Sequence, residues 1–291
     1  GANAVAVVDV SKRQLLKTIP VLFDPLAIAL SPNGQRIGVA SHRSGQVDMY
    51  PYEDKAIGDE KDIAIIDADS LEVVDHILDV ASTIHAMDFK NDSTLRLVGT
   101  VNQIEGPLND PATQSFQHRL MEFQTLSGAA SPTVSVDLSR QSSSAGSTGT
   151  LHGYTECAGS IWLVAEGSDA LLKLNDNYEE IGRIEASGRP RVVTCVDEYP
   201  YVVSSNRMTV TKIDDDPSTF DLGLTERRNS LLVDGLERFT GQGDGPADNR
   251  SCNNCHVDGL TDRVVWNAGP VVSRLVTRPL RWLEGTSMIG W

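Results

Sequence analysis

Short runs of alternating apolar and polar residues recur along roughly the first 215 residues of the chain. Two of them are similar over their whole length: VAVVDVSKRQLLKTI (5–19) and IAIIDADSLEVVDHI (63–77). Each has an apolar run that ends in aspartate, a polar turn, and a second run with paired apolar residues. Asp9 matches Asp67 at an offset of 58 residues. Because side chains alternate between the two faces of a strand, this pattern predicts a β-hairpin in each copy.

The residues that follow each predicted hairpin are also similar. DPLAIALSPNGQRIGVA (24–40) matches STIHAMDFKNDSTLRLV (82–98) with a slip of one residue, and SPNG supplies the turn residues that join two strands. We interpret the acidic stretch 48–62 as an insertion between the copies. Without it the period is about 42 residues, which is the size of a four-stranded propeller blade.

A further copy begins at SDALLKLNDNYEEIGRI (168–184) and continues through PRVVTCVDEYPYVVSS (190–205). Between the copies, RLMEFQTL and TVSVDL are strand-like but diverge from the repeat. The Ser/Gly-rich stretch 139–150 is predicted to be a loop with nothing to bury. Residues 1–222 therefore hold four to five blades, fewer than closed propellers usually contain. We expect an incomplete β-propeller, with an open β-sandwich or meander as the alternative.

The pattern changes to helical spacing near residue 225. Leu231, Leu232, Leu236 and Phe239 fall near one face of a helix. The glycines that follow end this helix, and they do not predict a phosphate-binding loop because no strand precedes them and no helix follows. We therefore expect a mainly β chain in which residues 223–291 form a second, small α module.

The α module contains the motif CNNCH, formed by Cys252, Cys255 and His256. A zinc site needs four ligands, and no second cysteine pair lies nearby. A thioredoxin-like redox pair belongs in a βαβ unit, whereas a helix and a Gly-rich loop precede this one. Haem c attachment uses two cysteines at this spacing, one for each vinyl group, and the next histidine as the proximal iron ligand. The motif and its preceding helix therefore favour one covalent haem c.

The charge of the chain is unevenly distributed. The net charge is −15, yet residues 226–291 hold eight arginines, no lysine and eight acidic residues, so the first 225 residues carry the whole excess. An acidic chain argues against nucleic acid as a partner, since phosphate binding needs clustered Lys and Arg. No apolar run approaches the ~20 residues that span a bilayer, so we expect no membrane span.

The remaining two cysteines, Cys157 and Cys195, lie in the β-rich part. They could form a disulfide in an oxidising compartment, or remain as two buried thiols. Their spacing in the sequence does not decide between these two states, because a disulfide depends on their separation in space.

The segments IAIIDADS, VVDHI, SPNG and RIGVA resemble the YVTN-type β-propeller repeat of bacterial and archaeal surface and periplasmic proteins. The resemblance covers roughly residues 1–215, with two clear copies and looser ones after them. It implies a propeller in a periplasmic or extracellular protein.

Residues 226–291 resemble the first haem domain of the bacterial di-haem cytochrome c peroxidase and methylamine-utilisation family. The shared features are the helix that ends at Phe239, the CNNCH motif, Asp262 and Trp266 after it, and the closing segment RWLEGT…W. The resemblance implies a c-type cytochrome domain. The family normally has two haem motifs, a second domain after the closing Trp, and in peroxidases a distal His after the first motif. This sequence has one motif and no His after His256, so a truncated domain is one expectation and a peroxidase role is in doubt.

Several other residues of this module are candidates for contact with the haem. Met288 is the only methionine in the module and a candidate distal ligand, with a packed core Met as the alternative. Arg278 and Arg281 are candidate partners of the propionates, with ordinary surface ion pairs as the alternative. Asp258 and Asp262 are expected to be turn formers, with a bound calcium ion as the alternative.

These features favour a secreted c-type haem electron-transfer protein, with the β-propeller as a docking scaffold. We expect a periplasmic or extracellular location and a redox partner protein or a second haem domain as its partner. The propeller could also form a homo- or hetero-oligomer. One alternative is a subunit or fragment of a di-haem peroxidase- or oxidase-like enzyme. Another alternative is a haem-bearing subunit of a surface assembly, in which exposed strand edges of the propeller would bind neighbouring subunits.

Overall fold

The computed structural model describes thirteen segments of the chain, and all structural statements below concern these residues. They are 3–22, 24–42, 61–78, 80–104, 114–126, 131–139, 148–186, 188–214, 217–223, 230–241, 251–256, 265–266 and 275–276. The chain divides into two compact units, residues 1–102 with 120–136 and residues 103–119 with 137–291. Each unit is described by itself.

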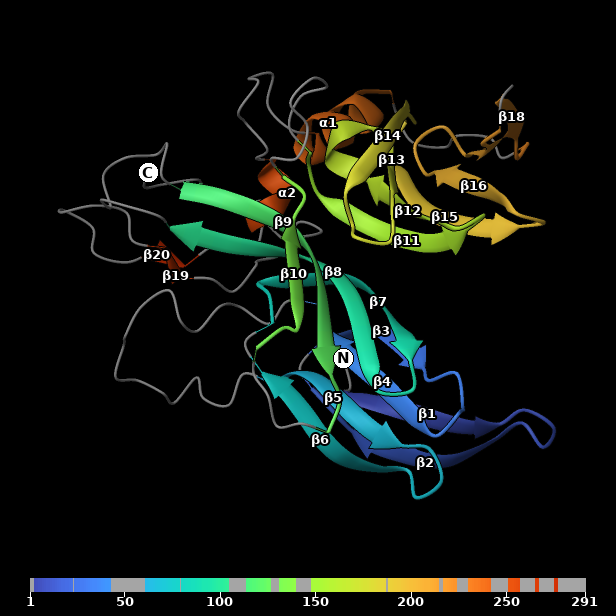
Figure 1. Ribbon diagram of the computed structural model, residues 1–291, viewed down its shortest axis with the longest axis vertical. Helices are drawn as coiled ribbons and strands as arrows, with labels where there is room; N and C mark the ends of the chain where they lie inside the picture. The colour runs from blue at the N-terminus through green and yellow to red at the C-terminus, as the bar shows by residue number, and fades with distance from the viewer. Residues whose placement is uncertain are drawn as a thin grey trace. The chain divides into compact units, whose positions relative to one another are not determined.

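Four four-stranded sheets contain most of the described strands, and in each sheet the strands lie in sequence order (Figure 1). The first is β3 to β6, with bounds Pro25–Leu30, Arg36–Ser41, Lys61–Asp67 and Glu72–Leu78. The second is β7 to β10, with bounds Thr83–Asn91, Thr94–Ile104, Gln114–Gln124 and Val134–Asp137. The third is β11 to β14, with bounds Leu151–Cys157, Ser160–Ala165, Ala170–Leu174 and Glu180–Glu185. The fourth is β15 to β18, with bounds Pro190–Val196, Tyr199–Ser204, Thr209–Lys212 and Ser218–Asp221.

The four sheets have the form of propeller blades. Their described strand pairs are antiparallel, for example β3 with β4 and β4 with β5, so each sheet is a simple meander. Neighbouring blades meet through their first strands: β3 contacts β7 in the first unit, and β11 contacts β15 in the second (Figure 1). The first strand of each blade is therefore the inner one, and the prediction of a mainly β chain is confirmed.

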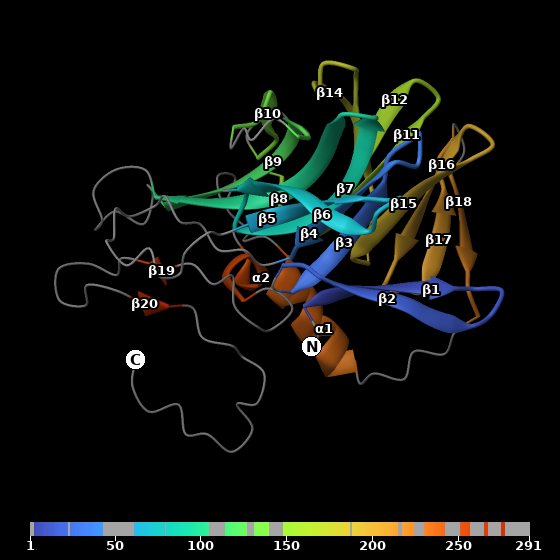
Figure 2. The same ribbon diagram turned by 90° about the horizontal axis from the view of Figure 1, so that it is seen from below.

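A two-stranded sheet, β1 (Ala4–Asp9) with β2 (Gln14–Pro20), precedes the first complete blade (Figure 2). Its register repeats that of β5 and β6 at the predicted offset of 58: Asp9 pairs with Gln14 as Asp67 pairs with Glu72. Both hairpins also have a register shift at the same place, after Val7 and after Ile65. The predicted repeat is thus present in the backbone, and β1–β2 corresponds to the outer half of a blade.

Apolar side chains between successive sheets form the core. In the first unit, Ile63 and Ile65 of β5 pack with Phe89 of β7 and Leu97 of β8. On its other face β5 presents Ile66, which packs with Ile19 of β2 and with strand β4. Strand β5 is buried on both faces because a sheet covers each of them.

Cys157 and Cys195 form a disulfide, with their Cα atoms 5.4 Å apart. Cys157 ends β11 and Cys195 lies in β15, so the bond joins the inner strands of two neighbouring blades. Of the two states that the sequence left open, the structure contains the disulfide.

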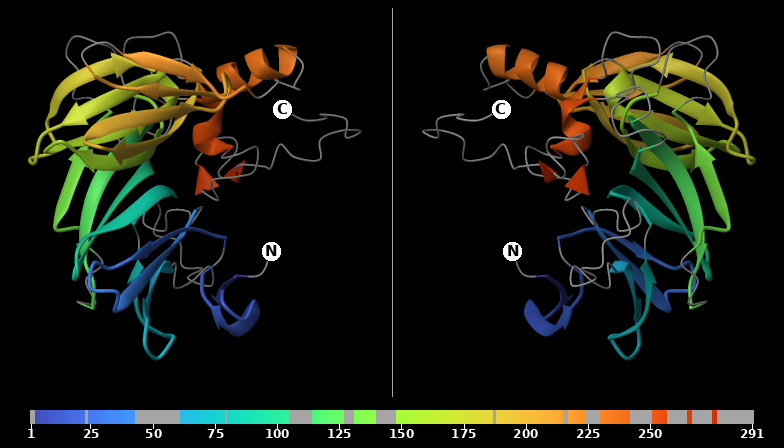
Figure 3. Two further views of the ribbon diagram at one scale, coloured as in Figure 1. Left: turned by 90° about the vertical axis from the view of Figure 1, so that its right-hand side faces the viewer. Right: turned by 90° about the vertical axis from the view of Figure 1, so that its left-hand side faces the viewer.

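Among the described residues of the second unit, the helices are α1 (Ser230–Thr240), α2 (Cys252–Cys255) and a short 3-10 turn, η3 (Glu166–Ser168). Helices α1 and α2 contact each other (Figure 3). A two-stranded sheet, β19 (Val265–Trp266) with β20 (Leu275–Val276), completes the described elements. No helix in the described part of the chain has the length and apolarity that crossing a membrane requires.

Helix α1 confirms the predicted helix but not a fully buried apolar face. Leu236 and Phe239 are half-buried, whereas Leu231 and Leu232 are 75% and 64% exposed. The two leucines of the first turn are therefore exposed to solvent, and the half-buried positions are Val233, Leu236 and Phe239.

Candidate functional site

The CNNCH motif forms a single helical turn. Helix α2 begins at Cys252, and the backbone N–H of His256 donates to the carbonyl oxygen of Cys252 at 2.9 Å. At the N-cap, Ser251 donates from its backbone N–H to Asn254 Oδ1 at 2.6 Å. The Ser251 hydroxyl donates to the same oxygen at 3.1 Å. One side chain, that of Asn254, therefore closes the turn on itself.

This turn fits covalent haem attachment. Positions three apart on a helical turn share a face, so the backbone brings Cys252 and Cys255 to one side of α2. The Cys252 side chain is exposed and its thiol is free, and His256 follows the turn directly as the C-cap residue. The side chain of Cys255 lies outside the described part of the structure. Two cysteines followed by a histidine are the residues that attach haem c and bind its iron.

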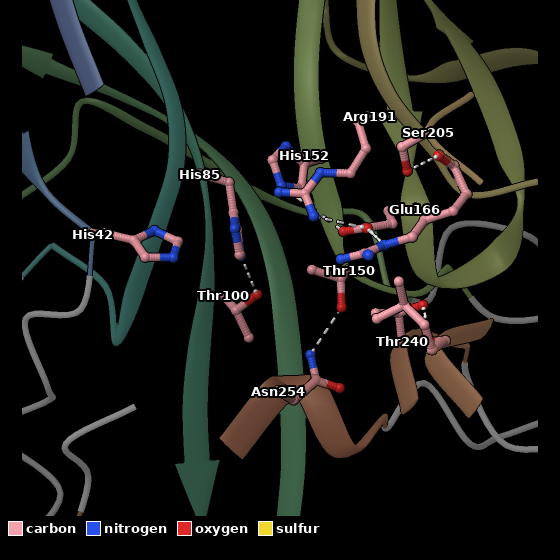
Figure 4. A network of polar contacts seen from close by, with 12 residues as sticks. His42, His85, Thr100, Thr150, His152, Glu166, Arg191, Ser205, Thr240 and Asn254 are labelled. Atoms are coloured by element: carbon pink, nitrogen blue, oxygen red, sulfur yellow. Dashed lines mark hydrogen bonds and ion pairs between the residues drawn. The ribbon is translucent and has the colours of Figure 1, made fainter. Parts of the chain in front are cut away.

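The turn is attached to the blade β11–β14. Asn254 Nδ2 donates to the hydroxyl of Thr150, which directly precedes β11, at 3.0 Å. Figure 4 shows the two side chains pointing at each other. Asn254 and Thr150 are both only 2% exposed. The motif is therefore fixed to the β-sheet part of the second unit through a buried hydrogen bond between residues 104 positions apart.

Thr150 belongs to a tightly packed pair of backbone segments. Its carbonyl oxygen accepts from the N–H of Gly167 in η3 at 3.4 Å, and the N–H of Gly149 donates to Ser168 Oγ at 2.6 Å. A Cβ on Gly149 would come within 2.6 Å of the backbone of Gly167. Only residues without a side chain allow the two segments to approach this closely.

A buried carboxylate lies in the same turn. The side chain of Glu166 is fully buried and pairs with Nε of Arg189 and, at 3.2 Å, with Nη1 of Arg191. Nε2 of His152 lies 3.8 Å from Glu166 Oε2, and Figure 4 shows His152 and Arg191 directed at this carboxylate. The cluster joins η3 to strands β11 and β15. Losing one partner of such a buried group typically costs about 3–5 kcal/mol, so the cluster fixes η3 in place.

Asp169, which follows η3, is half-buried. Burial raises the pKa of its carboxyl group, although the backbone N–H of Arg189, 2.9 Å from Oδ1, acts in the opposite direction. Asp169 thus ties the start of β15 to the same turn.

Helix α1 has one further link to the blades. Nδ2 of Asn206, in the turn between β16 and β17, donates to Oε1 of Glu237 at 3.3 Å. Together with the Asn254–Thr150 bond, this places both helices of the second unit against its β-sheets.

The remaining candidate residues are described only in part. Arg278, Arg281, Met288, Asp258 and Asp262 lie outside the described residues, and for Trp266 only the backbone in β19 is described. Their predicted roles at the haem or at calcium remain predictions. In the portion of the chain that is described, no group of three or more His, Cys, Asp and Glu side chains is placed to hold a metal ion.

The histidines of the strands are largely core residues. His42 and His85 are buried, with their rings edge to face and 5.7 Å apart. His42 Nδ1 lies 3.0 Å from the carbonyl oxygen of Ile84, and His85 Nε2 lies 3.2 Å from Thr100 Oγ1 (Figure 4).

The described residues of the stretch 139–150, which are 139 and 148–150, have neither helix nor strand, as predicted. The prediction that this loop has nothing to bury was wrong. Thr148 and Thr150 are buried, and Thr148 Oγ1 accepts from Nη2 of Arg183 at 2.7 Å. The Ser/Gly-rich composition was interpreted as a stretch with nothing to bury, whereas Gly149 serves close backbone packing. No sequence pattern linked these residues to Asn254 or to Glu166.

No protein-family model matches the sequence, and no curated protein matches it. Three solved structures have a similar fold. Hydrazine synthase from Kuenenia stuttgartiensis gives a TM-score of 0.55 at 13% identity, over 77% of this chain and 66% of the other. A protein of unknown function from Bacteroides caccae gives 0.50 at 9%, over 78% and 72%. Virginiamycin B lyase from Staphylococcus aureus gives 0.52 at 12%, over 77% and 64%.

The first and third of these neighbours are β-propellers. The sheets of this chain are those of a β-propeller. The chain spans 66% and 64% of these two neighbours, and at such low identity the likeness concerns the fold alone. It confirms the propeller part of the predicted fold. The comparisons provide no evidence for the cytochrome domain, which stays a prediction.

Proposed function

We propose that this chain is a c-type haem electron-transfer protein in which β-propeller blades carry the haem-binding turn. The proposal depends chiefly on one observation: CNNCH forms a single helical turn with a free, exposed thiol at Cys252. Cys252 and Cys255 would hold the haem through thioether bonds, and His256 would be the proximal ligand. When bound, the haem supplies one-electron redox chemistry.

The described residues around the turn hold it in place and do not supply groups for bond-making chemistry. Asn254 and Thr150 hold the turn on the blade β11–β14. The disulfide Cys157–Cys195 joins β11 of this blade to β15 of the next one. The titratable cluster at Glu166 is buried and paired with arginines, so it offers no acid or base accessible to a substrate. This arrangement supports electron relay more than catalysis.

The disulfide also supports a periplasmic or extracellular location, because such bonds persist in oxidising compartments. Haem c would then exchange electrons with a redox partner protein or with a second haem domain. The excess negative charge of the first 225 residues would favour a partner with a basic surface.

Optical spectroscopy of the haem-loaded chain tests the proposed role. Electron relay predicts low-spin, six-coordinate iron that is reversibly reduced and does not react with hydrogen peroxide. High-spin iron that reacts with peroxide would instead favour the peroxidase-like alternative. Light scattering of the same sample tests the surface-assembly alternative. That alternative predicts a defined oligomer, and a monomer would contradict it.

A further inference from the structure

Helix α2, which forms the proposed haem-binding turn, is only four residues long. Helices this short are unstable in isolation, because nucleation fixes several backbone angles for one hydrogen bond. Contacts from outside the turn must therefore hold its conformation. In the described part of the second unit, the Thr150 hydroxyl provides such a contact, at 3.0 Å from Asn254 Nδ2.

The amide of Asn254 is suited to this task because it is both an acceptor and a donor. Its Oδ1 accepts from the backbone N–H and the hydroxyl of Ser251 and so closes the turn. Its Nδ2 donates outward to Thr150. A buried polar group that loses its hydrogen-bond partner destabilises the folded state. Breaking the bond from Asn254 to Thr150 would therefore also destabilise the buried position of the turn against the blade.

Thr150 is itself held firmly. The close approach of Gly149 to Gly167 leaves no space for a Cβ, and the hydrogen bond from Gly149 N–H to Ser168 Oγ fixes the same segment. Glu166, at the start of η3, is clamped by arginines from the β14–β15 connection and β15. The hydroxyl that receives Asn254 is thus part of a rigid platform at the start of β11.

We propose that Thr150 and Asn254 are positioning residues for haem attachment: the folded blade β11–β14 keeps the CNNCH turn helical, so that backbone positions 252 and 255 lie on one side of the turn before the haem is bound. This inference depends on the proposed haem function only for its second readout. A consequence is that haem attachment should depend on the folded state of a blade that begins about a hundred residues earlier in the chain.

The test uses Thr150→Val, which removes the hydroxyl and keeps the side-chain shape, in the full chain. Thr150→Ser keeps the hydroxyl and should behave as wild type. Thr211→Val removes a hydroxyl from an exposed Thr–Thr pair at 3.1 Å in the same unit and serves as the matched control. For each variant, an intact Cys157–Cys195 disulfide and a cooperative melting transition establish that the blade is folded.

The first readout is deuterium exchange in the haem-free protein at the amides of Asn254 and His256, which donate within the turn. Loss of one hydrogen bond of ordinary strength corresponds to a rise of about five-fold in local exchange. We expect this rise in Thr150→Val and in Asn254→Ala but not in Thr150→Ser or Thr211→Val. Asn254→Ala should show the larger rise, because it also removes the bonds from Ser251. The double variant should exchange no faster than Asn254→Ala, because the contact with Thr150 is already lost there.

The second readout is the fraction of chains that carry covalent haem after co-expression with a haem c maturation system. Thr150→Val and Asn254→Ala should show a several-fold lower fraction than wild type, and the two controls an equal one. Unchanged exchange and unchanged haem content in Thr150→Val would overturn the inference, even if Asn254→Ala changes both, because Asn254→Ala also removes the cap at Ser251. A wild-type chain that takes up no haem would overturn the proposed function instead, and the exchange data would still decide whether Thr150 positions the turn.

Discussion

The hairpins β1–β2 and β5–β6 have the same local structure in different surroundings. Their strand registers agree at an offset of 58 from the pairs Val5–Ile19 and Ile63–Ile77 onward, including the bulge after Val7 and Ile65. Yet Ile66 is fully buried, whereas the matching Val8 is 51% exposed. Val73 packs against the Ile66 cluster, whereas the matching Leu15 is 62% exposed.

The difference lies on one face only. Val5 and Val7 pack toward the next sheet, just as Ile63 and Ile65 do. The opposite face of β5 is covered by β1–β2, while the equivalent face of β1–β2 is uncovered among the described residues. The comparison shows that the hairpin is specified locally, by alternation and turn chemistry, and that burial is supplied by the neighbouring blades.

The largest effect should separate Ile66 from Val8. Ile66→Ala empties a site buried between two sheets and is expected to lower the free energy of unfolding by about 2–5 kcal/mol. Val8→Ala removes an exposed side chain and should stay within about 0.5 kcal/mol of wild type. Denaturant unfolding of the two variants measures both values. Equal losses would mean that the two faces are equally covered in solution.

A smaller effect should distinguish the two hairpin turns at Arg13 and Leu71, which have matching positive φ angles of 54° and 57°. Arg13→Gly relieves the cost of the left-handed conformation and is expected to stabilise the chain by about 0.5–1 kcal/mol. Leu71→Gly gains the same relief but loses the packing of Leu71 against the Ile66 cluster, so it should stabilise less or destabilise. Thermal unfolding of both variants measures the two changes in stability. A larger gain in stability for Leu71→Gly than for Arg13→Gly would contradict the prediction.

The smallest difference is expected between Asp9 and Asp67, which end the two matching strands. Hydrogen bonds from Ser11 and then Lys12 lower the pKa of Asp9, and those from Ser70 lower the pKa of Asp67. Because both carboxylates are favoured in the folded state, their stabilisation is present above the ordinary aspartate pKa and is lost as the pH falls through the lowered value.

Carboxyl titration by NMR should therefore show both groups titrating below an ordinary aspartate. The melting temperatures of Asp9→Asn and Asp67→Asn should approach that of wild type in acid. An ordinary pKa at either position would show that the two turns do not share the same hydrogen bonds in solution.

The blades could be predicted from the sequence where the repeat is strong. Alternation and the aspartate turns predicted the β1–β2 and β5–β6 hairpins, and the prediction extended to β3–β4 through SPNG, where Gly34 adopts a φ of +73°. Strands β9 and β10 were less evident because their segments diverge from the repeat. The helical spacing predicted an apolar face on α1 but not what covers that face, and Leu231 and Leu232 are 75% and 64% exposed.

The sequence predicted which residues of the candidate site could bind a haem, but not which residues hold them in place. Cys252, Cys255 and His256 are recognisable because their spacing carries the mechanism. The partner of the turn, Thr150, could not be found, since it is a lone hydroxyl in a Ser/Gly-rich stretch 104 residues away. The Glu166 cluster was missed for a similar reason: its charges come from separate strands, and only the folded blades bring them together.

Covalent attachment of haem to this chain can be measured directly. The chain is co-expressed with a haem c maturation system, purified, denatured, and examined by its pyridine haemochrome spectrum and intact mass. We predict a c-type haemochrome band that survives acid extraction, and a mass greater than that of the bare chain by one haem. A colourless protein with the mass of the polypeptide alone would contradict it.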